Sequence, residues 1–278
     1  MQKLNNPEQL KKIANSLRKV IVEMVHRAQS GHPGGSLSAI DMLTVLYYYK
    51  MHHDPKNPKW ADRDRFILSK GHCTPAMYSI LAELGYFPKE ELLGYRKLNA
   101  LLQGHTSIHI PGIEMSAGSL GQGLSYGNGI AFAGKMDKKD YKVYVMVGDG
   151  ETQEGQVWEA AQTAGVHKLD NVVVLLDRNK IQNDWFVEKT KSIEPIADKW
   201  KAFNWHVIEI DGHDVKQIMK ALDDANNPAI VNGKPCVIIA QTVKGKGVSF
   251  MENNPDFHGK APNDAEFKQA MEELNKNG

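Results

Sequence analysis

The stretch VYVMVGDG, residues 143–150, is a short apolar run that ends abruptly in a Gly-Asp-Gly turn. A helical pattern follows over about 155–166, and a second apolar run at 172–176 ends in a polar turn that includes Asn179. Apolar strands that alternate with helices are typical of a parallel sheet with both faces covered. This segment therefore predicts an α/β fold, a parallel sheet with helices on both faces.

The same alternation continues toward the C-terminus. Apolar runs at 206–210 and 237–240 end at polar or glycine-rich residues, and a helical pattern at about 215–225 lies between them. A last helix is predicted from about Asn263. Open α/β sheets bind ligands outside the carboxyl ends of their strands, so we expect the functional residues at those ends.

The N-terminal part reads as helices and loops. Asn6 is the predicted N-cap of a helix that ends before the Gly- and Pro-rich residues 30–35. Two further helices are predicted at about 38–49 and after Thr74. Glycine recurs through residues 103–129, which lets the backbone approach a ligand or another chain closely.

We expect one domain over residues 1–278. A helical and loop region of about 1–130 is predicted to pack on a βαβ core of about 140–245.

Composition excludes several classes of protein. Lys plus Arg is 34 and Asp plus Glu is 33, which gives no electrostatic reason to expect nucleic acid or a membrane surface as partner. Two cysteines cannot form a disulfide framework, and no apolar stretch approaches the roughly 20 residues of a membrane span. No apolar signal core follows Met1. A soluble cytoplasmic protein is expected.

A metal site is predicted where the first two strands end. The 28 residues between Gly150 and Asn179 suffice for one crossover helix and a return strand, so Asp149 and Asn179 should lie side by side. Their oxygens suit Mg²⁺, with water and phosphate oxygens completing the octahedron. Gly150 lets its N–H approach a phosphate.

Other readings of this turn are weaker. Gly-Asp-Gly alone is more often a simple strand-ending turn. The chain has neither the G-x-x-x-x-G-K-[ST] nor the G-x-G-x-x-G pattern, so a nucleotide P-loop and a Rossmann dinucleotide site are unsupported.

Four of the eleven histidines lie in glycine-rich loops: His32, His72, His105 and His258. Loops on a rigid scaffold commonly carry function, and neutral imidazole can bond sugar hydroxyls and move their protons. A zinc site is disfavoured because no H-E-x-x-H or paired-Cys spacing occurs. Six others are interpreted as surface or hydrogen-bonded core residues: His26, His52, His53, His109, His167 and His206.

The Asp149–Asn179 pattern resembles the thiamine diphosphate motif. Together with the four histidine loops and GSLGQG at 118–123, it resembles transketolase from about residue 10 to 262, with the motifs in the family's order. The resemblance covers only the N-terminal, diphosphate-binding half of that enzyme. It implies a transferase subunit that lacks the pyrimidine-binding domain and works with a separate C-terminal subunit, in an α2β2 heterotetramer.

The resemblance also implies a role for individual residues. Asp149, Asn179 and the Ile181 carbonyl would bind Mg²⁺, with Ca²⁺ or Mn²⁺ as alternatives. The diphosphate would be held by His72, His258 and the Gly-Asp-Gly turn, Gly148 to Gly150. Gly118 would meet the aminopyrimidine and Leu120 the thiazolium. His32 and His258 would face the sugar phosphate's hydroxyls, His105 would meet the C1 hydroxyl of the donor, and Glu154 would lie at the subunit interface.

Three positions depart from the family pattern. Thr106 follows His105 where Pro is usual, Lys180 follows Asn179 where Gly is common, and Arg178 precedes it. Pentose phosphates remain the default substrates, and an unusual ketose, such as a branched or sulfonated sugar phosphate analogue, is the alternative.

Three rival functions rank lower. A 1-deoxyxylulose-5-phosphate synthase usually has Leu at the position of Pro33 and no acid matching Glu154. Two-chain pyruvate dehydrogenase components lack the His32 and His72 loops. A non-catalytic subunit that only binds thiamine diphosphate and Mg²⁺ is the non-enzyme alternative.

Overall fold

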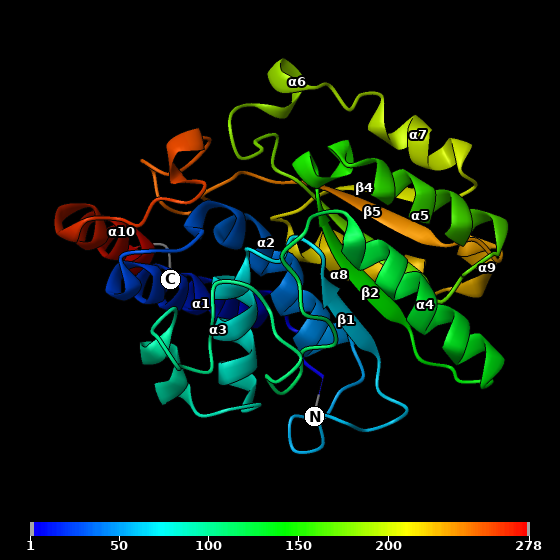
Figure 1. Cartoon of the computed structure of the whole chain (residues 1–278), viewed down its shortest axis with the longest axis horizontal. Coiled ribbons are helices and arrows are strands. Elements are labelled where there is room, and N and C mark those ends of the chain that lie inside the picture. The colour runs from blue at the N-terminus through cyan, green and yellow to red at the C-terminus, as the bar shows by residue number, and fades with distance from the viewer. Residues whose placement is uncertain (1–2, 277–278) are drawn as a thin grey trace.

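The computed structural model describes residues 3–276; residues 1, 2, 277 and 278, the ends of the predicted domain, lie outside the described part of the chain. Its centre is a parallel five-stranded sheet with the order β1-β2-β3-β5-β4 (Figure 1). The strands are β1 (Arg65–Leu68), β2 (Val143–Gly148), β3 (Val172–Arg178), β4 (His206–Asp211) and β5 (Cys236–Gln241).

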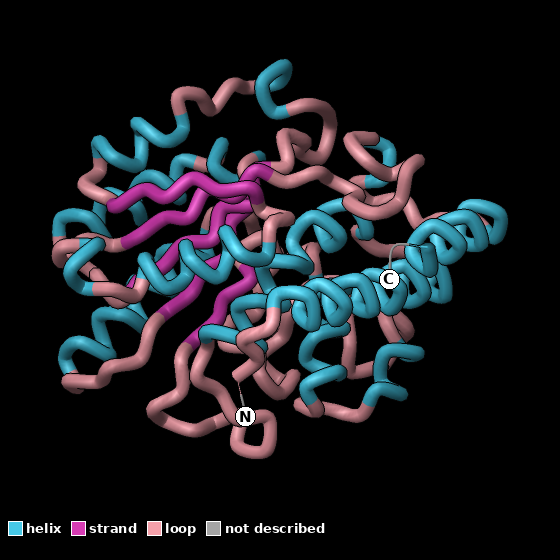
Figure 2. The backbone as a smooth tube through the Cα atoms, turned by 180° about the vertical axis from the view of Figure 1, so that it is seen from behind, coloured by secondary structure: helices cyan, strands magenta, loops and turns pink. Residues whose placement is uncertain are grey.

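Both faces of the sheet are buried, which confirms the predicted fold class. Val145 and its β3 neighbour Val174 pack into one apolar cluster, whereas Met146 and its neighbour Leu175 pack into another on the opposite face. The central strands therefore read as continuous apolar runs, as a sheet covered on both sides requires. The strands run side by side between helical layers (Figure 2).

Different helices cover the two faces. The face with Val145 is covered by α4 (Gln122–Met136), α5 (Gly155–Val166) and α7 (Ile196–Ala202). The other face is covered by α1 (Pro7–Ala28), α2 (Pro33–Val45), α3 (Thr74–Leu84) and α8 (Val215–Ala225), with α10 (Asp264–Lys276) packed on α1. The short helices α6 (Val187–Thr190) and α9 (Pro228–Val231) lie in connections.

The helix boundaries follow local chemistry. The Asn6 side chain accepts hydrogen bonds from the N–H groups of Glu8 and Gln9 at 2.9 and 3.2 Å, which confirms it as the N-cap of α1. Helix α2 begins at Pro33, five residues before the predicted apolar pattern, because Pro is favoured in the first helical turn.

Two elements near the site were not predicted. Strand β1 has four residues and follows a polar, turn-rich segment, so its periodicity is too short to detect. Helix α4 lies partly in the glycine-rich segment, where low helix propensity hides it. A Cβ on Gly127 would lie 2.7 Å from Val145 Cγ2, so this glycine lets α4 pack directly on β2.

The described residues carry two further findings. Cys73 and Cys236 are both buried free thiols. Among residues 3–276, no helix combines the length and apolar character that crossing a membrane requires.

Candidate active site

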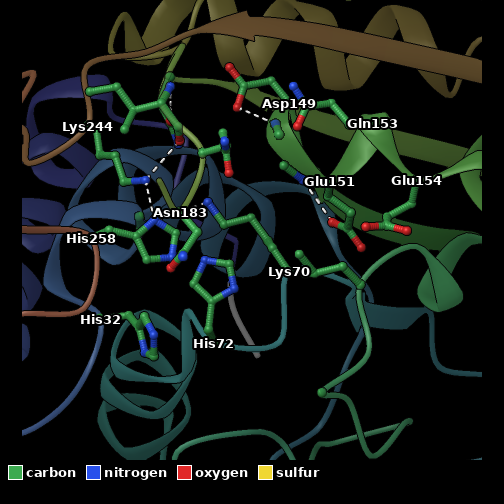
Figure 3. A pocket seen from close by; sticks show the side chains of 18 of the residues that line it. His32, Lys70, His72, Asp149, Glu151, Gln153, Glu154, Asn183, Lys244 and His258 are labelled. Atoms are coloured by element: carbon green, nitrogen blue, oxygen red, sulfur yellow. Dashed lines mark hydrogen bonds between the residues drawn. The ribbon is translucent and has the colours of Figure 1, made fainter. Parts of the chain in front are cut away.

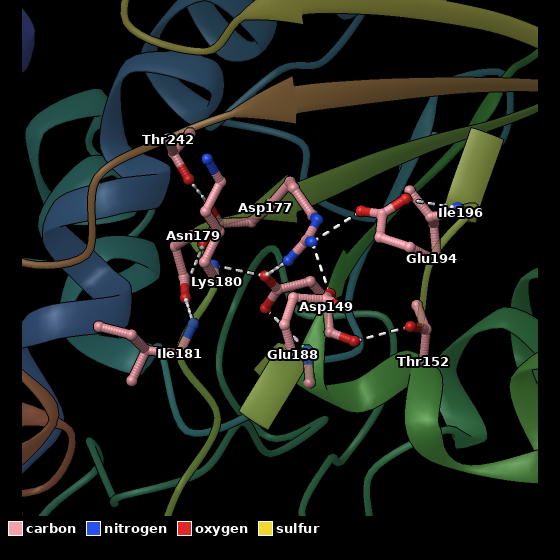
Figure 4. Close-up of polar contacts among 12 residues, drawn as sticks. Asp149, Thr152, Asp177, Asn179, Lys180, Ile181, Glu188, Glu194, Ile196 and Thr242 are labelled. Carbon is pink, nitrogen blue, oxygen red and sulfur yellow. Dashed lines mark hydrogen bonds and ion pairs between the residues drawn. The ribbon is translucent and has the colours of Figure 1, made fainter. Parts of the chain in front are cut away.

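The ends of β2 and β3 bring the predicted metal ligands to one edge of the sheet. Gly148, the last residue of β2, pairs with Asp177, and β3 ends one residue later at Arg178. Asp149 and Asn179 are therefore the first residues beyond the two strands, at the carboxyl edge of the sheet. Both side chains are buried and line the same cavity, which has a volume of about 300 Å³. The predicted neighbourhood of these two side chains is therefore confirmed (Figure 4).

All twelve candidate residues from the sequence line this one cavity. They are His32, His72, His105, Gly118, Leu120, Gly148, Asp149, Gly150, Glu154, Asn179, Ile181 and His258. They come from segments that lie far apart in sequence and that the fold brings together around the carboxyl edge of the sheet. The roles expected for them remain predictions.

The Asp149 carboxylate is held in a fixed position. Its Oδ1 accepts from Gly150 N at 2.7 Å, and its Oδ2 accepts from Lys180 N at 2.5 Å and from Arg178 Nη1 at 3.0 Å. Burial and the nearby Asp177 carboxylate raise the pKa of Asp149 above its usual value. A divalent cation would relieve this unfavourable burial of negative charge.

The amide of Asn179 is oriented by its neighbours. Its Nδ2 donates to Asp177 Oδ2 at 3.0 Å, so Oδ1 is the acceptor atom. Among the described residues, this oxygen accepts one hydrogen bond, from Ile181 N at 3.2 Å. No cluster of three His, Cys, Asp or Glu residues suited to a metal occurs in the described chain. The candidate set instead combines one carboxylate, one amide oxygen and one backbone carbonyl, which are hard ligands suited to Mg²⁺.

Two observations bear on whether a polar group such as a phosphate fits beside these oxygens. A Cβ on Gly150 would lie 2.5 Å from Gln182 Cβ, so only glycine fits where the turn presents its N–H. His32 Nδ1 is buried and has no hydrogen-bond partner within residues 3–276. The residues present therefore fit a bound polar group.

The four loop histidines form one cluster. The ring centroids of His32 lie 5.1, 6.5 and 5.5 Å from those of His72, His105 and His258. Burial, with Arg96 as the next cause, lowers the pKa of His32 to about 4; burial and Lys244 lower the pKa of His258 to about 3.

Burial also lowers the pKa of His72 and of His105. The cluster is therefore neutral at physiological pH and can accept hydrogen bonds and protons.

Lys244 is a site residue that the sequence did not single out. Its Nζ contacts Ile181 O at 2.8 Å and His258 Nδ1 at 2.7 Å (Figure 3). Burial, followed by repulsion from Lys70, lowers the pKa of Lys244 to about 8. The signal available in the sequence was its place in the Lys-Gly-Lys-Gly turn after β5.

Lys70 is a second buried cation that was missed. It forms an ion pair with Asp177 and donates to the Gly35 carbonyl at 3.1 Å. Although burial acts against its charge, the Asp177 carboxylate raises the pKa of Lys70 above its usual value. Lysines are rarely buried, so only the fold reveals this pair.

Glu151 lines the cavity and joins three segments of the chain. Its carboxylate accepts from Gly121 N at 2.8 Å, from Gly148 N at 3.0 Å and from the Ser69 hydroxyl. Glu154, in contrast, is exposed at the rim of the cavity.

The structure also shows the surroundings of the three residues that depart from the family pattern. Lys180 has a φ of 69°, a left-handed conformation that favours glycine. Arg178 pairs with Asp149, Glu188 and Glu194 (Figure 4). Thr106 Oγ1 donates to Met115 O at 2.9 Å and accepts from Ala117 N at 3.1 Å, so it braces the loop behind His105.

This fold and this site define a diphosphate-binding α/β domain. Residues 9–277 match the family described as "Transketolase, thiamine diphosphate binding domain". The chain belongs to the transketolase family, whose members are transferases.

Relatives of comparable length are named as transketolase subunits. The chain is 42% identical over 257 residues to one of the subunits of the apulose-4-phosphate transketolase of Phocaeicola vulgatus, covering 92% of this chain and 90% of that one. It is 43% identical over 266 residues to "6-deoxy-6-sulfo-D-fructose transketolase subunit SqwG" of Clostridium sp., covering 95% and 96%.

Single-chain transketolases match over part of their length. A crystal structure of transketolase from Campylobacter jejuni superposes with a TM-score of 0.92 at 37% identity, covering 97% of this chain and 43% of that one. The chain thus spans less than half of that enzyme.

Proposed function

We propose that this chain is the thiamine diphosphate- and Mg²⁺-binding subunit of a two-chain transketolase, which moves a two-carbon ketol unit from a ketose phosphate to an aldose phosphate. One observation carries the proposal: Asp149, Asn179 and the Gly150 N–H meet four neutral histidines in a single cavity. In this proposal the chain forms one diphosphate-binding domain, and the partner supplies the pyrimidine-binding domain.

The residues at the strand ends would hold the metal and the cofactor. Asp149, Asn179 and the Ile181 carbonyl would coordinate Mg²⁺, and Ca²⁺ or Mn²⁺ would suit the same oxygens. The diphosphate would lie against the Gly150 N–H, His72, His258 and Lys244. When bound, thiamine diphosphate supplies a carbon nucleophile and an electron sink.

The histidines would handle the hydroxyl protons of the substrate. An ammonium group can only donate, so His258 Nδ1 accepts from Lys244 and Nε2 carries the ring proton. His32 is neutral, and its buried Nδ1 has no hydrogen-bond partner within residues 3–276, so this ring is the proposed acceptor of a hydroxyl proton. Such proton transfers typically contribute about 10²–10⁴-fold in rate. His105, at the rim, would contact the C1 hydroxyl of the donor.

The partner subunit would cover the open side of the cavity. Glu154 is exposed there, and Tyr126 of α4 is 45% exposed although it is a large aromatic residue. Residues 112–129 together with Glu154 are the proposed interface. An α2β2 heterotetramer would complete both copies of the site.

The substrate is proposed from two observations. The relatives named above include one for apulose 4-phosphate and one for 6-deoxy-6-sulfo-D-fructose. Thr106 and Lys180 depart from the pattern of transketolases beside the substrate region. An unusual ketose, branched or sulfonated, is therefore a second candidate beside the pentose phosphates.

The test is reconstitution with the candidate C-terminal subunit, thiamine diphosphate and Mg²⁺. Ketol transfer only in the mixture, with a complex in sedimentation, is the expected result. Transfer should be measured with pentose phosphates, a branched ketose phosphate and a sulfonated ketose. Cofactor binding without transfer to any acceptor would instead identify a non-catalytic subunit.

A further inference from the structure

Lys244 reaches the cavity from the turn that follows β5, residues 242–247. Several backbone contacts hold this turn. Val243 N donates to His213 Nε2 at 2.9 Å, Gly245 N donates to Gly34 O at 3.0 Å, Lys244 O accepts from Asn253 N at 2.9 Å, and Lys246 O accepts from Arg18 Nε at 3.2 Å. The anchors flank Lys244 on both sides. The first of them is made to a side chain, at the residue that immediately precedes Lys244 in sequence.

The His213 contact fixes the tautomer of the ring. A backbone N–H can only donate, so Nε2 must be the unprotonated nitrogen, and the proton of the neutral ring lies on Nδ1. Nδ1 in turn lies 2.7 Å from Asp41 Oδ2. The ring thus links a buried carboxylate to the backbone of the turn, as a carboxylate commonly orients a functional imidazole.

Asp41 is suited to this role because it is a fixed anion. It is 4% exposed and pairs with Arg18, which is itself 7% exposed. Burial opposes its charge, but Arg18 and His213 hold the pKa of Asp41 below its usual value. Arg18 also bonds Lys246 O, so the same carboxylate is connected to both ends of the turn.

The Lys244 side chain is closely surrounded by its neighbours. A Cβ on Gly34 would lie 3.1 Å from Lys244 Cγ, which shows how closely α2 packs along the lysine side chain. The Lys244 ammonium simultaneously contacts Ile181 O and His258 Nδ1. A shift of Val243 would therefore move a cation that touches both the expected metal ligand and the expected diphosphate ligand.

We propose that His213, oriented by Asp41, is a positioning residue that sets the backbone of Val243 and so directs Lys244 into the cofactor cavity. His213 does not itself line that cavity. The link to cofactor binding rests on the proposed function, whereas the link to the turn does not.

The first experiment uses the chain alone and measures amide hydrogen exchange at residues 241–247. In His213→Asn the amide keeps a group near Nδ1 for Asp41 but removes the acceptor of the Val243 N–H. We expect exchange of Val243 to accelerate about tenfold, as loss of one hydrogen bond implies. In His213→Gln the oxygen lies near the former Nε2, and we expect protection to be largely restored.

Imidazole ¹⁵N shifts of the wild-type chain provide a second readout, in which His213 should show a protonated Nδ1 and an unprotonated Nε2. His206→Asn is the matched control, because it makes the same substitution on β4 at a residue without a role in the site. Unchanged Val243 exchange in His213→Asn, or a His213 ring protonated on Nε2, would overturn the positioning of the turn.

The second experiment uses the reconstituted two-chain enzyme. In His213→Asn the concentration of thiamine diphosphate that gives half-saturation should rise about tenfold, as expected for a displaced charge-assisted bond. The kcat at saturating cofactor should change less, and His213→Gln should recover. If Val243 exchange accelerates in His213→Asn but the half-saturating concentration of thiamine diphosphate stays unchanged, the proposed effect of His213 on Lys244 is wrong. A wild-type mixture without transfer would overturn the proposed function alone.

Discussion

Arg178 Nη1 lies 3.0 Å from Asp149 Oδ2, so the carboxylate expected to bind the metal is already paired with a buried cation. The second nitrogen of the same guanidinium contacts Glu188 and Glu194, each at 2.7 Å. One side chain thus connects the end of β2 to the segment that follows β3.

Replacing this cation should destabilise the chain. In Arg178→Met the Asp149 carboxylate stays buried without its partner, and breaking a buried pair costs about 3–5 kcal/mol. Urea denaturation should therefore show a free energy of unfolding lower by about that amount. Lys189→Met, on the same segment but at the surface, serves as control. Equal stability of the two variants would contradict the pairing.

The metal prediction is tested by Asp149→Asn. Loss of the charged ligand should weaken Mg²⁺-dependent binding of thiamine diphosphate by at least about 100-fold, since even outer-shell changes cost about 10–100-fold. Isothermal titration of the two-chain complex in the presence and absence of Mg²⁺ measures this. Binding that stays Mg²⁺-dependent with wild-type affinity would exclude Asp149 as a ligand.

Gly150 and Gly155 differ in the space around them, so the same substitution at both positions can be compared. In Gly150→Ala the new Cβ would meet Gln182 Cβ at 2.5 Å, and overpacking of this kind costs about 1–3 kcal/mol. In Gly155→Ala nothing lies within 4 Å of the new Cβ, so stability should stay within about 0.5 kcal/mol of wild type. Denaturation curves of both variants decide the matter. Equal curves would show that the turn can relax.

The histidine cluster should make stability depend on pH. An unfolded histidine titrates near 6.5, whereas burial lowers the pKa of His32 to about 4 and that of His258 to about 3. Below pH 6.5 these histidines therefore bind protons in the unfolded chain but not in the folded chain. The free energy of unfolding then falls as the pH is lowered toward about 4.

Each such group contributes a slope of up to about 1.4 kcal/mol per pH unit. His258→Gln removes one of them, so its stability should fall less steeply with decreasing pH than that of wild type. Urea denaturation over this pH range measures both slopes. Identical slopes would indicate that His258 titrates normally in the folded chain.

The sequence predicted those features that local pattern encodes. Four of the five strands, the helix α8 at its observed bounds and the Asn6 cap follow from periodicity and capping chemistry. The predicted meeting of Asp149 and Asn179 followed from a rule about parallel strands. It required no knowledge of side-chain packing.

What was missed depends on contacts between distant segments. Lys70 and Lys244 look like ordinary surface lysines until the fold buries one beside Asp177 and the other beside His258. The role of His213 likewise appears only when α2 brings Asp41 to it. Helix α4 was hidden because its glycines lower its helix propensity, and one of them, Gly127, lets the helix pack on β2.

The Glu151 carboxylate connects three segments of the chain at this edge of the sheet. This carboxylate accepts hydrogen bonds from Ser69, Gly121 and Gly148. A change in any one of these three segments would therefore also affect the other two. Efforts to vary the substrate range of the proposed transferase should therefore start at the exposed rim, around Asn183, and leave this junction untouched.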